Sequence, residues 1–289
     1  NHLETVDPAV IRSGRFDLKL HVPHPNKQGL EEILTAKLGP ENGIRLDLSS
    51  LADRLLGLSG AVAEAVVRDA LGRARADRTP VRQEYLDSAA DQIAPELDKD
   101  TLRRAAIHEA GHVVVMIQLG WPLPKRVCLT SQGGQVEHEP LRSMTPSTAK
   151  EQLQVLLAGR AAEICIFGNP SSGAGKGGQS DLAQATSLAL AVERQWGFGE
   201  SGLLWDGLTA ADIWRAPKDV QEKAEFHLRE AQDKALEIVS DQKSCIMNLA
   251  EQLLRVREMN RLDIAAFIGE TAPKEDFSNE HGMSESQPF

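Results

Sequence analysis

Apolar residues recur at helical spacing over much of the chain, and residues 27–93 predict four consecutive short helices. These helices are separated by Gly39, by Gly57 and by Pro80, residue types that commonly end helices. Before them, residues 16–22 alternate apolar and polar side chains at period two, which predicts one strand. The beginning of the chain is therefore expected to hold a strand followed by a small helical domain.

From Asp100 onward, the pattern predicts a second and larger helix-rich domain. Residues 101–120 are expected to form a helix that Asp100 caps and that ends near Gly120. Residues 125–140 are more irregular and predict one or two short strands.

The rest of this domain also predicts helices. One begins at Thr145 or Ser147, has Pro146 in its first turn and ends at Gly168. After a loop rich in Gly and Ser, Ser180 is expected to cap the next helix. The later helices are expected at residues 181–196, 217–239 and 241–258, and residues 271–289 lack periodicity and are expected to be disordered.

Charge and cysteine content narrow the class of protein. The formal net charge is -10 and the pI is near 5.4, which argues against a nucleic-acid-binding surface. The cysteines form no CxxC pair, so they predict neither a disulfide framework nor a cysteine zinc site and favour a reducing, cytoplasm-like compartment. They are Cys128, Cys165 and Cys245.

The sequence carries no signal for a membrane span or for export. No apolar run approaches the roughly 20 residues that cross a bilayer. Residues 1–30 lack the charged-then-apolar layout of a signal peptide. The chain starts with Asn1 and enters patterned sequence at once, so we expect an N-terminal portion to be missing. The expected location is the cytoplasm, or the inner face of a membrane if an upstream anchor exists.

The stretch AAIHEAGHVVVM, residues 105–116, carries the most specific chemistry in the sequence. On a helix, residues four apart share a face, so His108 and His112 direct their imidazoles at one point. Neutral imidazole is a good zinc ligand, and Glu109 reaches such a site without binding the metal. A catalytic zinc lowers the pKa of its water towards about 7. Glu109 would then act as the general base and return the proton to the departing amine of a peptide bond.

The alternative is a helix whose histidines and glutamate face solvent or make only local hydrogen bonds. Small Ala110 and Gly111 between the histidines, and the aliphatic run at residues 113–115, favour a helix buried beside its metal. A zinc held by two histidines also needs a third protein ligand.

Four patches of sequence resemble the FtsH-type ATP-dependent zinc metalloproteases, which join an AAA+ ATPase module to a HEAGH peptidase domain. The patches are NHLETVDPAVIRSGRFD, LLGLSGA, HEAGH, and the pair LLAGRAAE with SDLAQAT and QWGF. The resemblance as a whole covers the chain from Asn1 to about Gly269. The resemblance implies a mainly α fold in four parts. These are the end of an AAA+ α/β large domain (residues 1–26), a helical AAA+ lid (27–95), a largely helical zinc peptidase domain with a small β element (96–270) and a disordered tail (271–289).

The resemblance implies Asp181 as the third zinc ligand, because the family places an aspartate at this point. The helix dipole favours an acid in a first turn, so a plain helix-capping acid is the alternative. Glu163 is either a competing ligand or a residue that orients a histidine. The family usually has a second acid directly after it, where this chain has Ile164.

In the N-terminal patches, the resemblance implies residues that bind nucleotide. Asn1 stands where the family has its sensor asparagine. Arg12 and Arg15 match the arginines that reach into a neighbour's nucleotide site, which implies a ring; surface ion pairs are the alternative for them. Gly60 and Ala61 match a turn of the helical lid. The expected cofactors are Zn²⁺ and, in the full-length protein, ATP and Mg²⁺.

One loop sequence bears on whether the chain can bind and hydrolyse ATP. Residues 173–178, GAGKGG, are superficially similar to a P-loop, but Gly177 follows the lysine and Pro170 stands in place of the first glycine. The chain alone is therefore not expected to hydrolyse ATP.

Residues 131–140, SQGGQVEHEP, lie where the family has an edge strand beside the zinc, and such a strand binds an extended substrate by main-chain pairing. His138 within it is expected to be a surface histidine.

Together, these observations predict a zinc-dependent endopeptidase that hydrolyses unfolded or damaged proteins delivered by an ATP-driven AAA+ ring. By resemblance, the ring is a homohexamer. No nucleic-acid partner is expected, and a membrane anchor is expected only through a missing N-terminal region. The alternative is a ring-forming remodelling or scaffold module whose peptidase domain is idle, although an intact HEAGH and Asp181 favour the enzyme.

Overall fold

The computed structural model describes residues 7, 10, 22–39, 46–139, 141, 143–175, 177–200, 202–203 and 205–271. Most of the predicted strand at residues 16–22 lies outside this part of the chain, as do Asn1, Arg12, Arg15 and residues 272–289. Contacts between residues divide the chain into two units, Asn1–Ile93 and Ala94–Phe289. The predicted domain boundaries and their AAA+ assignments stay predictions.

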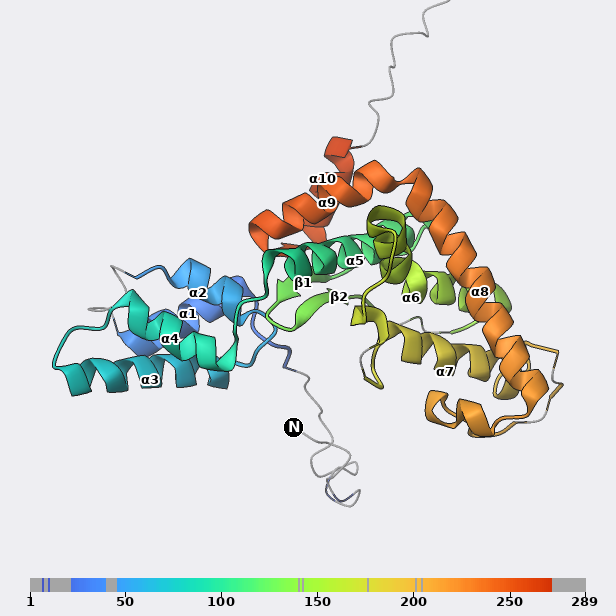
Figure 1. Cartoon of the computed structure of the whole chain (residues 1–289), viewed down its shortest axis with the longest axis horizontal. Helices are drawn as coiled ribbons and strands as arrows, with labels where there is room; N and C mark the ends of the chain where they lie inside the picture. Colours follow the sequence, from blue (N-terminus) through green and yellow to red (C-terminus); the bar gives the residue numbers. More distant parts are fainter. Residues whose placement is uncertain are drawn as a thin grey trace, which may run out of the picture. The chain divides into compact units, whose positions relative to one another are not determined.

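The first unit is helical in its described residues, as the apolar pattern predicted (Figure 1). Its helices are α1 (Lys27–Leu38), α2 (Leu48–Leu55), α3 (Gly60–Asp77) and α4 (Gln83–Ile93). Leucines at helical spacing, among them Leu30, Leu34 and Leu86, are fully buried in its core. Gly39 ends α1 with a φ of 79°, a conformation that glycine adopts without strain.

The second unit consists mainly of helices, with a small antiparallel sheet beside them (Figure 1). Its helices are α5 (Lys99–Gln118), α6 (Pro146–Phe167), α7 (Asp181–Arg194), α8 (Lys218–Asp241), α9 (Lys243–Val256) and α10 (Arg261–Thr271), with 3₁₀ helices η3 (Gly173–Gly175) and η4 (Ala210–Arg215). The strands β1 (Arg126–Thr130), β2 (Gly133–Glu137) and β3 (Glu258–Asn260) are ordered β2-β1-β3, and both pairs are antiparallel. The predicted fold class, mainly helical with a small β element, is confirmed.

The structure shows which residues cap helices α5, α6 and α7 at their N-terminal ends. Thr145 and Ser180 cap α6 and α7 as predicted, each accepting a backbone N–H hydrogen bond. For α5 the prediction was wrong, because Asp98 rather than Asp100 is the cap and accepts from the backbone N–H groups of Asp100 and Thr101. Both positions carry an acid, and Asp98 is the one with the extended backbone that a cap requires.

The C-terminal end of the second unit also differs from the prediction. The helix expected at residues 241–258 ends at Val256, because Arg257 takes a left-handed conformation with a φ of 63°. The chain then adds β3 to the sheet and continues as α10, neither of which was predicted. A strand as short as Glu258–Asn260 gives too few alternations to be recognised from its pattern.

Helix α5, which carries HEAGH, is the centre of the second unit. It packs against α6, α8 and α9 and against strands β1 and β2. Every residue from Ala106 to Met116 is buried, so this stretch of the helix has little contact with solvent. His108, Glu109 and His112 belong to the buried stretch. The alternative of a helix whose motif faces solvent is therefore wrong.

Helices α5 and α6 approach each other at very short range. A Cβ added at Gly111 would lie 2.7 Å from the Cβ of Ala162 and 2.8 Å from the carbonyl oxygen of Ala158. No side chain fits at that distance, so a glycine on α5 facing two alanines on α6 sets the separation of the helices.

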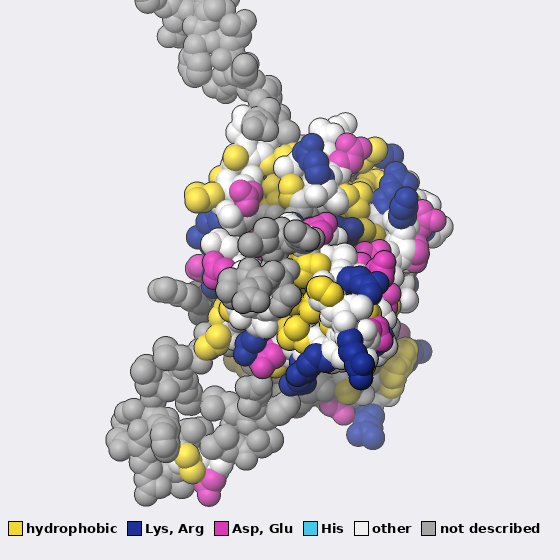
Figure 2. Space-filling model, turned by 90° about the vertical axis from the view of Figure 1, so that its left-hand side faces the viewer, with side chains coloured by type: hydrophobic (Ala, Val, Ile, Leu, Met, Phe, Trp, Pro, Cys, Tyr) yellow, Lys and Arg dark blue, Asp and Glu magenta, His cyan; other side chains and the backbone are white. Residues whose placement is uncertain are grey.

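The outer surface carries charges of both signs. On the face shown in Figure 2, Lys and Arg side chains lie among Asp and Glu side chains rather than in one basic area. Ion pairs in the first unit, such as Lys37 with Glu64 and Arg73 with Asp69, belong to this mixed surface. Across the described residues, none of the helices combines the length and the apolar composition that a membrane crossing needs.

We expect Gly111→Ala to destabilise the second unit by roughly 1–3 kcal/mol, because the added methyl forces α5 and α6 apart. Gly269→Ala in α10 is the control: its added Cβ meets nothing within 4 Å, and replacing a helical glycine favours the helix by up to about 1 kcal/mol. All four tryptophans lie in the second unit, so urea unfolding followed by tryptophan fluorescence reports on it. Equal midpoints for Gly111→Ala and the wild type would contradict this account of the packing.

Candidate metal centre and active site

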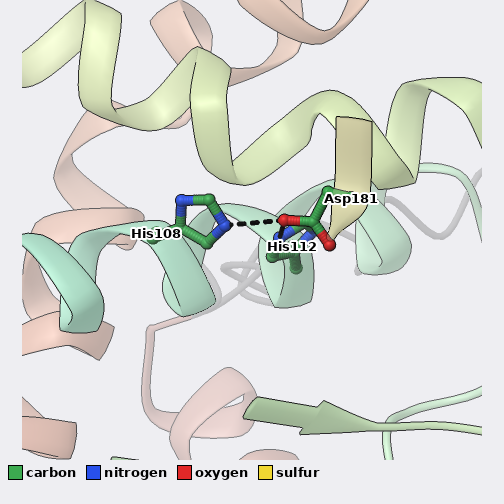
Figure 3. A group of neighbouring side chains, drawn as sticks. All are labelled: His108, His112 and Asp181. Atoms are coloured by element: carbon green, nitrogen blue, oxygen red, sulfur yellow. Dashed lines mark hydrogen bonds and ion pairs between the residues drawn. The ribbon is translucent and has the colours of Figure 1, made fainter. Parts of the chain in front are cut away.

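Two helices bring three metal-ligand candidates together. His108 and His112 lie one helical turn apart on α5, and Asp181 is the first residue of α7 (Figure 3). Each histidine is 7% exposed. The hydroxyl of Ser180 caps α7 by accepting a hydrogen bond from the N–H of Ala183, which fixes where the helix begins and where Asp181 projects.

The donor atoms of these residues converge on one point. The Oδ2 of Asp181 lies 3.0 Å from the Nε2 of His108 and 3.4 Å from the Nε2 of His112. One ligand atom from each residue lies within 4.8 Å of the others. Two ligands at about 2.0–2.1 Å from a tetrahedral zinc are separated by roughly 3.3 Å. The observed spacing therefore fits a zinc ion bound by all three residues.

Helix α6 holds the second nitrogen of each imidazole. The Nδ1 of His112 lies 2.7 Å from the carbonyl oxygen of Val155, and the Nδ1 of His108 lies 2.8 Å from the Oε1 of Glu163. Because a carbonyl oxygen only accepts, the Nδ1 of His112 carries a proton, and its Nε2 is the nitrogen that faces Asp181. Such partners fix the orientation of each ring and raise the basicity of the nitrogen that faces the metal.

The charges of the cluster favour a cation between the donors. Burial by itself lowers the pKa of His108, but hydrogen bonds to Asp181 and Glu163 outweigh burial and raise this pKa to about 10. Burial by itself raises the pKa of Asp181, but the two histidines hold it well below its usual range. The imidazole and the carboxylate thus attract positive charge to the point between them, whether a proton or a divalent metal ion.

Glu163 lies beside the donor cluster rather than in it. Its side chain is 1% exposed and contacts the Nδ1 of His108. In Figure 3, this ring nitrogen points away from Asp181. Its two oxygens also accept hydrogen bonds from the backbone N–H of Ser171 at 2.6 Å and from the Ser171 hydroxyl at 3.0 Å. These contacts favour the role of orienting a histidine over the role of a competing ligand.

Glu109 is buried beside the histidines and is not a member of the donor cluster. Burial raises the pKa of its carboxyl group above the ordinary value. Strand β2 comes close to this side chain: a Cβ added at Gly134 would lie 2.6 Å from the Oε1 of Glu109. The absence of a side chain at Gly134 therefore lets the strand approach the carboxylate without displacing it.

A cavity of about 650 Å³ opens onto the cluster. It is lined by His108, Glu109, His112 and Asp181, by β2 and by the loop before α7, including Ser171 and Gln179. Strand β2 is at the edge of the described sheet. His138, predicted as a surface histidine, is half-buried and lines the cavity outside the donor cluster.

The match to a known family covers most of the second unit. The model of peptidase family M41 matches residues 95–267. The chain belongs to peptidase family M41. This membership implies zinc, and the His-His-Asp cluster of the M41 domain fits that ion.

Several curated relatives of this M41 chain carry the name "ATP-dependent zinc metalloprotease FtsH", which confirms the resemblance to FtsH-type enzymes. The protein from Leuconostoc mesenteroides is 29% identical over 100% of this chain and 45% of its own length. The proteins from Lactiplantibacillus plantarum and Ralstonia pickettii are 34% and 33% identical over 69% of this chain and over 28% and 30% of their own lengths. The chain thus spans less than half of each of these relatives.

The sequence alone missed three residues that shape the M41 site. Arg104 stands four residues before His108 and so shares its helical face, a spacing that was a usable signal. Gly159 on α6 faces the same ring, and a Cβ there would lie 2.6 Å from the Cε1 of His108. Ser171 lies in a loop rich in Gly and Ser, where nothing in the sequence distinguishes it from its neighbours.

The residues that the resemblance assigned to nucleotide binding stay predictions. Asn1, Arg12 and Arg15 lie outside the described residues. Gly60 begins α3, and a Cβ there would lie 3.0 Å from the Cδ1 of Ile33, which gives this glycine a packing role. Ala61 follows it and is exposed.

We expect Gly159→Ala to weaken zinc binding about 10-fold or more, because the added methyl displaces the His108 ring. The same change raises the helix propensity of α6, so lost metal would not reflect a weaker helix. Competition with a chromophoric chelator measures the dissociation constant. Gly178→Ala is the control, since its added Cβ meets nothing within 4 Å. An unchanged constant for Gly159→Ala would mean that the ring does not need this glycine.

Proposed function

We propose that this chain contains the peptidase part of an ATP-dependent zinc metalloendopeptidase that hydrolyses peptide bonds of unfolded or damaged proteins. The observation that carries the proposal is that a zinc-type donor set and the buried carboxylate of Glu109 line one cavity. Membership of peptidase family M41 supports it. The name that the relatives share supports the dependence on ATP.

His108 and His112 would hold the zinc ion through their Nε2 atoms, and Asp181 through a carboxylate oxygen. When bound, zinc lowers the pKa of a water molecule and polarises the carbonyl group of the peptide bond. Glu163 and the carbonyl oxygen of Val155 keep the two imidazoles in the orientation that binds metal.

Glu109 is the proposed general acid and base. Its carboxylate takes a proton from the attacking water and returns it to the amine that departs when the C–N bond breaks. Its buried position in the wall of the cavity places it beside the histidines and next to β2, where a substrate would lie. Glu109 therefore moves the proton, while the three proposed ligands only hold the metal.

Strand β2 is the proposed substrate-binding strand. It lines the cavity and pairs with β1 along one of its edges, at the end of the described sheet. An extended polypeptide adds to such an edge by main-chain hydrogen bonds, which give affinity with little selectivity for side chains. Unfolded proteins offer extended segments of this kind, which supports them as the substrate class.

Ring assembly and coupling to ATP are further parts of the proposal. We infer a homohexamer in which Arg12 and Arg15 reach the nucleotide site of a neighbour, with Asn1 and the turn at Gly60 and Ala61 at the chain's own site. The AAA+ parts would be residues 1–26 and 27–95, and the peptidase residues 96–270. ATP and Mg²⁺ would act in the full-length protein, in the cytoplasm or at a membrane if an upstream anchor is present. The shared name of the relatives, ATP-dependent zinc metalloprotease FtsH, supports the dependence on ATP.

Glu109→Gln separates the peptidase from an idle scaffold. The amide keeps the size of the side chain but does not accept a proton, so we expect cleavage of an unfolded, fluorescently labelled protein to fall about 100-fold or more. Elemental analysis should still find about one zinc per chain, since Glu109 is not among the proposed ligands. Undiminished cleavage by Glu109→Gln would mean that Glu109 is not the general acid and base. A wild type that holds zinc and cleaves no polypeptide, with or without its ATPase module, would favour the scaffold.

The ligand set has its own test. We expect His112→Ala and Asp181→Ala each to lose zinc, because two remaining ligands do not hold the ion tightly. His138→Ala is the matched control, because His138 lines the same cavity outside the donor cluster. Zinc content by elemental analysis after dialysis against a weak chelator distinguishes the variants. Retention of zinc by Asp181→Ala would make Asp181 a capping acid only.

A further inference from the structure

Arg104 connects the helix of the histidines with the loop that leads to Asp181. It lies on α5, one turn before His108. One guanidinium nitrogen donates to the Oε2 of Glu163 at 3.3 Å and to the carbonyl oxygen of Asn169 at 3.2 Å. The other donates to the Oδ1 of Asn169 at 3.0 Å. The side chain keeps 30% of its surface exposed, so these contacts lie at the rim of the site.

Glu163 is the acceptor that these contacts share. A carboxylate has about four lone-pair positions. The donors to Glu163 are the Nδ1 of His108, the backbone N–H and the hydroxyl of Ser171, and the guanidinium of Arg104. A buried carboxylate surrounded in this way is held in one orientation, and the His108 ring is held with it.

The same contacts fix the beginning of the loop between α6 and α7. Gly168 ends α6 in a left-handed conformation, and the chain then passes Asn169, which binds Arg104, and Ser171, which binds Glu163. The Ser171 hydroxyl also accepts from the N–H of Gly173, at the start of η3. This loop ends where α7 begins with Asp181, so its first residues are anchored on the side of the site that carries His108.

We propose that Arg104 is a positioning residue for the metal centre. It holds Glu163 against the Nδ1 of His108 and fastens the start of the loop that delivers Asp181. It thereby sets the affinity for the metal without being a metal ligand. This inference rests on the proposed function, in which the His-His-Asp cluster binds zinc.

The chemistry of arginine explains why this residue type stands here. A planar guanidinium carries several N–H donors in a fixed fork, so it reaches a carboxylate and a backbone carbonyl at once. It also lies over the ring of Phe167, with its Cζ 4.4 Å from the ring centroid. A lysine ammonium would reach Glu163 or Asn169, but it lacks the fork that holds both.

The test is the zinc dissociation constant of the chain, measured by competition with a chromophoric chelator. We expect Arg104→Met to weaken zinc binding about 10- to 100-fold, the range typical of residues that orient metal ligands. Arg103→Met is the matched control: Arg103 is exposed and lies 5.4 Å from the centroid of the same Phe167 ring. The control is expected to stay within about threefold of the wild type. Equal constants for the two variants would overturn the proposal.

A double-mutant cycle shows whether Arg104 acts through Glu163. If it does, Arg104→Met combined with Glu163→Gln loses no more affinity than the larger of the two single losses. Fully additive losses would overturn the proposed route. Arg104→Lys provides a second variant that keeps the charge and the stem, and we expect an affinity between those of the wild type and Arg104→Met. Affinity equal to the wild type in Arg104→Lys would overturn the need for the fork.

A spectroscopic readout separates positioning from general destabilisation. With Co²⁺ in place of Zn²⁺, the visible absorption bands report on the ligand geometry, and we expect them to shift in Arg104→Met but not in Arg103→Met. Unshifted bands together with unchanged affinity would overturn the role of Arg104 and leave the proposed function intact. A wild-type chain that binds no zinc would instead overturn the proposed function on which the inference rests.

Discussion

The convergence of three electron-pair donors on one point is the constraint on which the rest of the second unit depends. Two imidazole nitrogens and a carboxylate oxygen lie within 4.8 Å of one another in a largely buried place. Such an arrangement is unfavourable unless positive charge lies between the donors. The surrounding structure must therefore hold the donors in place. It does so from α6, whose Val155 and Glu163 bind the outer nitrogens of the two histidines.

Close packing makes this support available. Gly111 and Gly159 lie on the facing sides of α5 and α6, and at each the neighbouring helix occupies the space of a side chain. At Gly111 the partner is the backbone and alanine surface of α6, and at Gly159 it is the His108 ring itself. The helix separation that buries the core therefore also puts α6 within hydrogen-bonding distance of the imidazoles.

Two buried glutamates beside the same histidines have different electrostatic surroundings. Burial raises the pKa of both, but hydrogen bonds from His108 and Ser171 outweigh it for Glu163 and hold the pKa of that carboxyl group below its usual value. For Glu109, burial outweighs the attraction of the histidines. The surroundings thus favour the ionised form of Glu163, whereas burial favours the protonated form of Glu109. Ile164 follows Glu163 directly in the sequence, and the basic side chain of Arg104 contacts that glutamate.

The sequence by itself determined the features that depend only on residues close to one another along the chain. Helix geometry alone places His108 and His112 on one face, and short-range patterns located most helices and the caps at Thr145 and Ser180. The aspartate was reached by family resemblance, since Asp181 is 73 residues from His108 and no local pattern joins them. Only the tertiary structure decided which buried acid contacts the outer nitrogen of His108, where Arg104 binds and that β3 joins the sheet. The reason is physical: these contacts join residues far apart in the sequence, through the packing of α5 against α6 and the pairing of β3 with β1, and local periodicity does not encode either.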